Sequence, residues 1–569
     1  CLAWLAAVGM LGSEARLNAQ APAAGDPFGQ AKPEPAATEK PVAEKPPVEQ
    51  PKDPLVLAVE SVSTTRPEDI LWSLETLLNL GQPEEAKKYA RKLFRNPPDA
   101  AAMAELQRKF GWAFFFRLIR EPSLQPEGQS LGQAVLDAAY QSARDPERLR
   151  ALIAKLSDPS IEVRRLALND LREARDAGAV ALILTLSGPN QPTTQAILRS
   201  ALVELGQVAE GPLWGALESP DGNLQSQILE VLGRLGSRAA IPHLLRPALA
   251  EGVSPEVRRV ARQSLQRIVG ELPTQSDAEQ YLLREANAYL DGKAPARANA
   301  DGLVTVWVWD TSDGSLVAKQ LDAQVASARL ALRLAGELQQ LAAGQSQYQR
   351  LYLTALLAAA KLQAGPDVPL PMDPGTPGAT AAAAGAQALE EVLALALDKR
   401  YTAAALGALD VLPEVGNAQL LANPNGQPRP VAQALRDPDL QIRFAAVATI
   451  VHWDPQQPYP GCSYLPEALG YFARAAGTRR ALVGHPRMEQ AQTLAGVLLE
   501  LGFEVDTSQI GHDVMRLAAG NPDYEFVLVS DALDAPPVKE FIQQLRRDPN
   551  TTRLPVGVMA REQNLENLQ

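Results

Sequence analysis

The chain is poor in the residues that usually build metal sites and disulfide frameworks. It has two cysteines, Cys1 and Cys462, and four scattered histidines among 569 residues. Two cysteines cannot form a disulfide framework or a zinc knuckle, and the histidines show no metal-binding spacing. Clustered nucleophiles and paired carboxylates are missing from the sequence as well. We therefore predict no catalytic residue, no metal site and no cofactor, and we do not expect an enzyme.

Basic charge, aromatic residues and long apolar runs are also scarce. The formal net charge is −12, which argues against a nucleic-acid partner because phosphate contacts need concentrated Lys and Arg. No internal segment reaches the roughly 18 continuous apolar residues of a membrane span, so no integral span is predicted in the mature chain. Aromatic residues make up 5% of a chain that is 46% apolar. That balance favours helix pairs packed through small and unbranched side chains.

The amino end has the pattern of an export signal followed by a tether. Residues 2–12 form the apolar run LAWLAAVGMLG, and Ala19-Gln20-Ala21 fits a small-x-small cleavage site. Residues 1–21 are therefore interpreted as part of a signal peptide, and the protein is expected to be periplasmic or secreted. The first helix of a soluble domain is the alternative interpretation. Residues 22–54 are mostly Pro, Ala, Glu and Lys, which predicts a disordered, extended linker.

Residues 55–145 predict a first helical unit. One helix stops at Gly81, and the next ends before Pro97. Together with Ala86, these residues resemble half of a tetratricopeptide (TPR) repeat. The aromatic cluster Phe110–Ile119 is predicted to be packed core, because dense aromatic side chains are more often buried than ligand-binding.

The strongest pattern lies in residues 146–270, where a period of about 30 residues recurs. Each period closes with a glycine and is split in two by a second helix breaker. The closing glycines are Gly178, Gly206, Gly236 and Gly270. Paired short helices at this period predict a helical solenoid, which offers a binding surface rather than a reaction.

Several residue types recur in phase within this array. They are Pro159, Val163, Arg164 and Arg165; then Leu232, Gly233, Leu235, Gly236, Ala240, Ile241 and Pro242; then Pro255, Val257, Arg258 and Arg259. The pattern resembles the HEAT repeats of the bacterial lyase-like type, which implies an armadillo-like α-solenoid. In such repeats the arginines more often bridge to carboxylates or helix ends in the neighbouring unit than bind a ligand. The resemblance therefore implies structural roles for Arg164 and Arg258.

The middle of the chain interrupts the array and then resumes it. Trp307 and Trp309 stand two apart beside an Asp-Gly turn, so they share one face of a predicted hairpin. They are expected to pack that hairpin onto the helices, with a recognition platform as the alternative. The predicted segments are a helix and connector at 271–300, the hairpin at 301–321, a helical pair at 322–364, a linker at 365–386, and HEAT-like repeats with a connector at 387–477.

From residue 478 the pattern changes to short strands that alternate with helices, which predicts a parallel sheet with covering helices. Two stretches, Leu-Leu-Glu-Leu-Gly-Phe-Glu-Val and Leu-Arg-Arg-Asp-Pro-Asn followed by Leu-Pro-Val, resemble the CheY-like receiver domain of response regulators. Residues 478–569 are therefore expected to form an incomplete, doubly wound, flavodoxin-like module.

The receiver chemistry is degenerate in this sequence. A working receiver needs an acidic pair after its first strand, because Mg²⁺ takes carboxylate oxygens, and this chain has His485 and Pro486 there. Ser530 occupies the phosphoacceptor place at the end of the third strand, with Asp531 one step beyond, and Ala560 replaces the small hydroxyl residue. Asp531 is the one candidate phosphoacceptor, and we expect a pseudo-receiver.

These patterns lead to one functional hypothesis and two rivals. We expect a non-catalytic scaffold of the bacterial cell envelope that binds protein partners of unknown identity through a HEAT-repeat surface. The first rival is a cytoplasmic two-component or phosphorelay protein whose receiver regulates the helical array. An enzyme of lyase type, suggested only by the name of the repeat family, is placed last.

Overall fold

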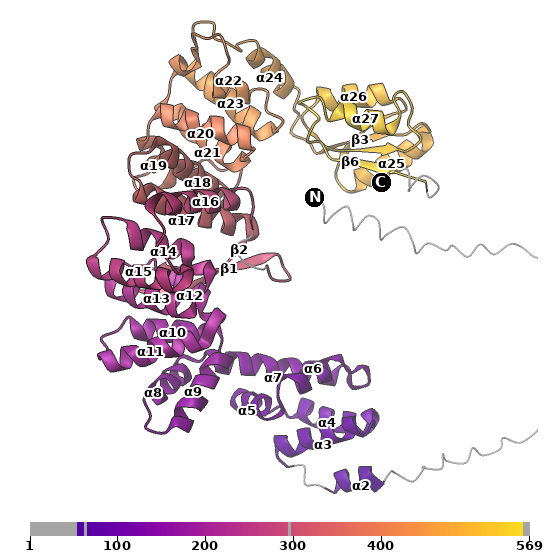
Figure 1. Cartoon of the computed structure of the whole chain (residues 1–569). Coiled ribbons are helices and arrows are strands. Elements are labelled where there is room, and N and C mark those ends of the chain that lie inside the picture. Colours follow the sequence, from indigo (N-terminus) through magenta and orange to yellow (C-terminus); the bar gives the residue numbers. More distant parts are fainter. Residues whose placement is uncertain (1–53, 62–64, 294–297, 562–569) are drawn as a thin grey trace, which may run out of the picture. The chain divides into compact units, whose positions relative to one another are not determined.

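The structure is a computed structural model that describes residues 54–61, 65–293 and 298–561. The predicted signal peptide and all but the last residue of the predicted linker at 22–54 lie outside the described residues. The chain divides into two compact units, residues 1–90 and 91–569, which are treated separately below. The secondary structure is mainly helical (Figure 1).

The first unit contains helices α2 (Pro54–Glu60) and α3 (Pro67–Asn79) and the start of α4 (Pro83–Arg95). Pro67 lies in the first turn of α3, where backbone N–H groups have no partner within the helix, so a residue without an N–H is tolerated there. Leu71, Leu74 and Leu77 are fully buried along one face of α3. Pro67 and Pro83 each open a helix whose first turn also carries two acidic residues, a pattern typical of helix starts.

The second unit opens with α5 (Ala100–Phe110), α6 (Trp112–Arg120) and α7 (Glu127–Arg144). The predicted aromatic core is only half buried. Phe115 is fully buried and its ring meets the edge of Phe114, with 5.1 Å between the ring centroids. Trp112 and Phe116 lie on the other face of α6, 45% and 49% exposed. A helix turns its side chains through all directions, so a run of aromatics cannot all face the core.

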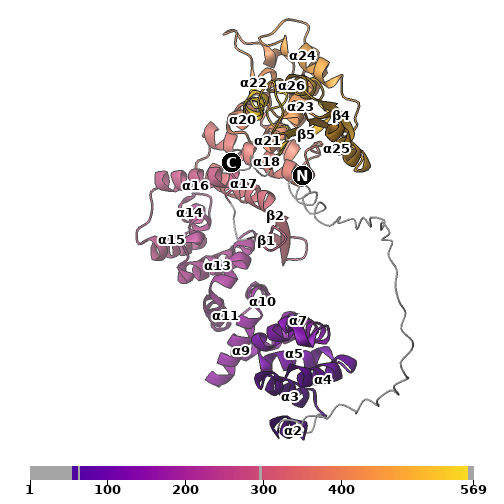
Figure 2. The ribbon, with the colours of Figure 1, turned by 90° about the vertical axis from the view of Figure 1, so that its right-hand side faces the viewer.

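The repeat array follows as a chain of packed helix pairs (Figure 1, Figure 2). Its helices are α8 (Pro146–Lys155), α9 (Ile161–Glu173), α10 (Asp176–Leu186), α11 (Pro192–Leu205), α12 (Glu210–Ala216), α13 (Gly222–Leu235), α14 (Ile241–Leu249) and α15 (Pro255–Val269). Helix α11 packs on α13, and α13 packs on α15, so equivalent helices of successive repeats are neighbours. This arrangement is that of an α-solenoid.

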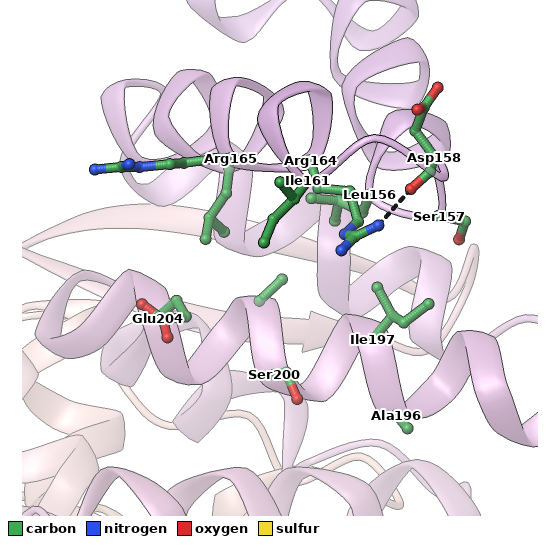
Figure 3. Close-up of a pocket in the computed structure, with 12 residues that line it drawn as sticks. Leu156, Ser157, Asp158, Ile161, Arg164, Arg165, Ala196, Ile197, Ser200 and Glu204 are labelled. Atoms are coloured by element: carbon green, nitrogen blue, oxygen red, sulfur yellow. Dashed lines mark hydrogen bonds between the residues drawn. The ribbon is translucent and has the colours of Figure 1, made fainter.

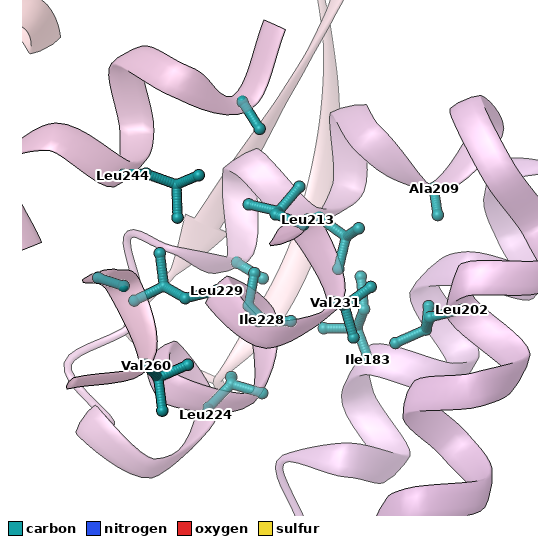
Figure 4. Close-up of a cluster of buried hydrophobic side chains, with 14 of the residues drawn as sticks. Ile183, Leu202, Ala209, Leu213, Leu224, Ile228, Leu229, Val231, Leu244 and Val260 are labelled. Atoms are coloured by element: carbon teal, nitrogen blue, oxygen red, sulfur yellow. The ribbon is translucent and has the colours of Figure 1, made fainter. Parts of the chain in front are cut away.

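The core of the array is aliphatic. Ile183, Leu202, Leu213, Ile228 and Leu244 are almost completely buried and come from five different helices (Figure 4). Each such side chain contributes about 1.5–3 kcal/mol when it leaves water. The stability of the array therefore comes from packing between neighbouring repeats, not from any single helix.

Three of the four predicted closing glycines end a helix. Gly206, Gly236 and Gly270 follow α11, α13 and α15 with φ between +70° and +86°, the conformation that glycine adopts at low cost. Gly178 differs, because it lies inside α10. A Cβ on Gly178 would stand 2.3 Å from the carbonyl oxygen of Leu171, so this glycine permits close approach to α9 instead of ending a helix.

After α16 (Gln275–Leu290), strands β1 (Leu303–Asp310) and β2 (Ser315–Asp322) form the predicted antiparallel hairpin. The backbone and Cβ of Trp307 lie on α12, where a Cβ on Gly215 would meet them at 2.8 Å. Trp309 is partly buried against the same core. The expectation that both tryptophans pack the hairpin onto the helices is confirmed. Helices α17 (Ala323–Leu341) and α18 (Ser346–Ala364) follow and pack on each other.

The segment 365–386 does not behave as the linker that its composition predicts. It contains α19 (Pro377–Ala383), and Leu370 and Ala381 are buried in the adjoining core. Lys361, only 3% exposed, donates to Asp410 at 2.6 Å and to the carbonyl oxygen of Val368 at 2.8 Å. Asp410 also accepts the N–H of Leu370 at 3.2 Å. These bonds hold the Pro- and Gly-rich chain against α18 and α21 (Thr402–Val415).

Further helices continue the array. They are α20 (Ala386–Lys399), α21, α22 (Pro430–Ala434), α23 (Leu440–Trp453) and α24 (Tyr464–Phe472). Within the described residues, no single helix is long and apolar enough to cross a membrane. The pair α19 and α20, bent by 113°, meets the length and composition test only when its two helices are taken together. Buried residues of this pair belong to the helical core.

The last part of the chain forms a four-stranded parallel sheet in the order β4-β3-β5-β6. Its elements are β3 (Arg480–Gly484), α25 (Met488–Glu500), β4 (Glu504–Ser508), α26 (Gly511–Gly520), β5 (Tyr524–Ser530), α27 (Val538–Leu545) and β6 (Val556–Met559). Ala481 and Val483 face the core under α25, whereas Leu482 faces the core under α26 and α27. Helices therefore cover both faces of the sheet. Membership of the receiver family stays a prediction.

Candidate functional site

A groove lies between α9 and α11 in the repeat array and is bordered at one end by the loop after α8 (Figure 3). Its volume is about 670 Å³, within the range of small-molecule and peptide-binding clefts. The lining residues are Leu156, Ser157, Asp158, Ile161, Arg164, Arg165, Leu168, Ala196, Ile197, Ser200, Ala201 and Glu204. We refer to it below as the α9–α11 groove.

The groove exposes apolar side chains at the start of α9. Ser160 caps that helix by accepting the N–H of Val163 at 3.5 Å, and Ile161 is therefore its first residue. Ile161 is 71% exposed, the highest exposure among the large apolar side chains described. Leu168 and Ile197 continue the apolar surface inward, where they pack against the buried core.

Arg164 and Arg258 make structural hydrogen bonds, but not the bridges to a neighbouring unit that the resemblance implied. Arg164 donates to the carbonyl oxygens of Asp158 at 2.7 Å and Pro159 at 3.0 Å. Arg258, in the equivalent place of another repeat, donates to the carbonyl oxygens of Glu251 and Val253. Both arginines thus fold back on the loop before their own helix. They satisfy carbonyl groups of the loop between the two helices of a pair, which would otherwise depend on water.

Two other charged residues line the groove: Glu204 is paired with an arginine, and Arg165 extends toward solvent. Glu204 accepts an ion pair from Arg172 at 3.6 Å, and its carbonyl oxygen accepts from the same guanidinium at 2.7 Å. Arg165 is exposed, and Figure 3 shows its side chain extending away from Ile197 and Ser200. The groove therefore offers an apolar surface with a polar rim, which suits the apolar face of a protein segment.

The candidate phosphoacceptor lies at the carboxyl edge of the parallel sheet, where ligands bind in such folds. Asp531 follows the last residue of β5, and its side chain is 4% exposed. Its carboxylate accepts the backbone N–H of Arg561 at 3.1 Å and lies 3.3 Å from the Arg561 guanidinium. Sequence reasoning missed Arg561, which follows β6 and reaches Asp531 only because β5 and β6 are neighbours.

The places of the missing acidic pair show no carboxylate. The Nδ1 atom of His485, directly after β3, accepts the N–H of Arg487 at 3.0 Å. Across the part of the chain that the structure describes, no three His, Cys, Asp or Glu side chains gather in a way that could hold a metal ion. The topology brings His485, Asp531 and Ala560 to one edge of the sheet, and of these three residues only Asp531 carries a carboxylate of the kind that Mg²⁺ prefers.

Fold and groove define the class: a helical-repeat protein with an exposed apolar groove, which carries a small parallel α/β module. No protein-family model matches the chain. It is 30% identical over 99 residues to the phycocyanobilin lyase subunit beta of Nostoc sp., covering 17% of this chain and 49% of the relative. It is 26% identical over 132 residues to the protein of the same name from Thermosynechococcus vestitus, covering 23% and 62%. The chain thus spans about half to three fifths of these relatives.

This comparison overturns the expectation that the chain is not an enzyme, because both relatives are named as subunits of a lyase. It also raises the lyase-type alternative that the sequence placed last. The expectation that the chain is not an enzyme rested on the absence of clustered nucleophiles, paired carboxylates and metal ligands within this one sequence. The relatives are named as subunits, and the activity of a subunit can belong to an assembly, which such a count does not detect.

Proposed function

We propose that this chain is a protein-binding subunit with a lyase-like role, and that it engages its partner through the α9–α11 groove. The observation that carries the proposal is the exposed apolar surface of the groove, headed by Ile161 at 71% exposure. Single exposed apolar side chains are common, but a contiguous apolar surface beside a cleft often marks a protein-interaction site. The names of the relatives support a subunit that works with another protein.

The partner surface that fits this groove is the apolar face of a helix or loop. Burying Ile161 under such a segment contributes about 1.5–3 kcal/mol, so its loss should weaken binding roughly tenfold or more. The test variant is Ile161→Glu. Leu166→Glu is the matched control, because Leu166 is 65% exposed on the same helix and does not line the groove.

The experiment places a photo-crosslinking residue at Ile197 in the full chain and captures partners from cells that contain a bilin lyase system. The proposal is supported by a partner that crosslinks when residue 161 is isoleucine. That crosslink should be lost with Ile161→Glu and retained with Leu166→Glu. Equal capture by both variants contradicts it, because the two substitutions differ only in whether the altered side chain lines the groove.

The lyase-like part of the proposal has its own test. Phycocyanobilin is mixed with the purified chain, alone and with the captured partner, and its absorption spectrum is followed. A spectral shift or a covalent adduct that needs this chain supports a lyase-like role. An unchanged spectrum in every mixture contradicts that role and leaves partner binding to stand on the crosslinking result.

Two further expectations remain part of this proposal. We propose that the protein works outside the cytoplasm, which fractionation of cells that make the full gene product tests against the cytoplasmic alternative. We also propose that the parallel α/β module is a pseudo-receiver, because Arg561 occupies the Asp531 carboxylate. Incubation with a small-molecule phosphodonor and Mg²⁺ tests this, and phosphate on Asp531 would support the phosphorelay alternative instead.

A further inference from the structure

A second cavity of about 300 Å³ lies where the hairpin meets the helices, between α12, α14, β1 and α17. Two tryptophans line it, Trp214 from α12 and Trp307 from β1. The Trp307 backbone sits directly on Gly215, where any Cβ would come within 2.8–2.9 Å of it. The glycine therefore fixes the depth at which this indole enters the cavity.

Two residues that line this cavity also carry buried polar atoms without partners. His243 lines it, is 4% exposed and stacks on Trp214 with 5.3 Å between the ring centroids. Burial, and next the charge of Arg333, hold the pKa of His243 well below its usual value, so the ring is neutral. The Nδ1 atom of His243 and the Nε1–H of Trp214 are buried and have no hydrogen-bond partner in the described structure. Such groups cost free energy unless something satisfies them.

One arginine and one glutamate of the cavity have no ion-pair partner among the residues described. Arg333 is engaged, since it donates to the carbonyl oxygen of Trp214 at 3.0 Å and pairs with Glu337 at 3.3 Å. Arg329, one turn earlier on α17, is half-buried and has no ion-pair partner among the residues described. Glu210 also lines the cavity without an ion-pair partner in that part of the chain. A half-buried arginine beside aromatic rings favours a planar anion.

We propose that this cavity is a binding site for a small aromatic carboxylate. The carboxylate pairs with the Arg329 guanidinium, the flat ring lies against the indoles of Trp214 and Trp307, and neutral His243 offers one hydrogen bond. The Glu210 carboxylate opposes the ligand charge from the wall of the cavity. This inference is independent of the α9–α11 groove and of the lyase-like role, because none of its residues lines that groove.

The probe is 2-naphthoate, with the neutral 2-naphthamide as a matched ligand of similar shape, and binding to the full chain is measured by calorimetry. Arg329→Gln should weaken naphthoate binding about tenfold or more, because it removes a charge-assisted bond. It should change naphthamide binding less than about twofold. Glu210→Gln should strengthen naphthoate binding, because it removes a like charge.

Arg267→Gln is the control, because Arg267 is exposed on α15 and does not line the cavity. It should leave the binding of both ligands unchanged. The proposal is overturned if the wild-type chain does not bind naphthoate or binds the amide as tightly. It is also overturned if Arg329→Gln and Arg267→Gln have equal effects, or if Glu210→Gln weakens naphthoate binding. Partner capture through the α9–α11 groove should be the same in all three variants.

Discussion

Gly233 marks the closest approach between neighbouring repeats and offers a sharp test of how the array is held together. A Cβ added to Gly233 would stand 2.4 Å from the Cβ and Oγ atoms of Ser264 on α15, and 2.6 Å from its backbone α-carbon. Ordinary van der Waals separations begin at 3.4 Å. Ser264 is 1% exposed, so its backbone has no room to retreat, and Gly233→Ala must push α13 and α15 apart.

The magnitude follows from two opposing effects. Overpacking of this kind costs about 1–3 kcal/mol, whereas alanine gains up to about 1 kcal/mol over glycine in a helix interior. The expected net loss is about 1–2 kcal/mol, which makes local opening roughly 5- to 30-fold more frequent. Hydrogen exchange followed by mass spectrometry on peptides from α13 and α15 measures that change directly.

Two further variants decide whether the reasoning holds. Gly222 begins the same helix, and a Cβ there would meet only Val257 at 4.0 Å, so Gly222→Ala should leave exchange unchanged or slow it. Adding Ser264→Gly to Gly233→Ala should restore part of the protection. The rescue is partial because the serine side chain is removed, whereas the clash with the backbone at residue 264 persists. Wild-type exchange rates in Gly233→Ala would refute the claim that this close approach limits the spacing of the repeats.

Two other predictions concern buried ionisable groups. Asp410→Ala should release the segment 365–376 and lower the free energy of unfolding by about 3–5 kcal/mol, because buried Lys361 loses its charged partner. The rate of thermolysin cleavage beside Leu370 measures this release. Asp373→Ala, at an exposed position, is the control and should not increase the cleavage rate. His243 has a pKa well below its unfolded value of about 6.5, so the unfolded state binds its proton first and stability is lost as the pH falls below that value. By pH 5 the loss is up to about 2 kcal/mol, and His243→Phe should remove it. Burial raises the pKa of Glu337, which makes the folded state more stable as the pH falls and so opposes the effect of His243. Comparing the pH dependence of stability in His243→Phe and in the wild type separates the contribution of the histidine. Equal pH dependence in the two proteins would contradict the assignment.

The sequence predicted the parts of this fold that depend on local signals. The recurring residue types placed the paired helices of the array, and the glycines at 206, 236 and 270 end helices as expected. It could not predict what depends on distant residues. The segment 365–386 is ordered because Asp410, more than twenty residues farther on, accepts bonds from Lys361 and Leu370. Gly178 lies inside α10, where its missing side chain lets the Leu171 carbonyl of α9 approach closely.

The candidate sites were harder to predict than the fold for the same reason. The repeat pattern predicted structural roles for Arg164 and Arg258 with partners in the neighbouring unit, whereas their partners are carbonyl groups within seven residues along the chain. The groove needs α9 beside α11, and the cavity at the hairpin needs four elements that are spread over more than 120 residues. The sequence alone did identify Trp307 as a residue on one face of the predicted hairpin. It held no signal for Arg329 or for the bond between Arg561 and Asp531, because both depend on tertiary packing.

One repeat shows how the array can change the use of a shared position. In residues 437–444, Asp439 takes the capping place of Ser160, and Arg443 takes the place of Arg164. Arg164 returns to its own loop, but Arg443 is 4% exposed and donates to Asn550 of the α/β module, while Arg553 pairs with Asp439. Arg443 also lies over the Tyr471 ring at 5.0 Å. The arginine that closes a loop in one repeat thus anchors the neighbouring module in another, so a recurring pattern of residue types fixes the helices without fixing the partner of each side chain.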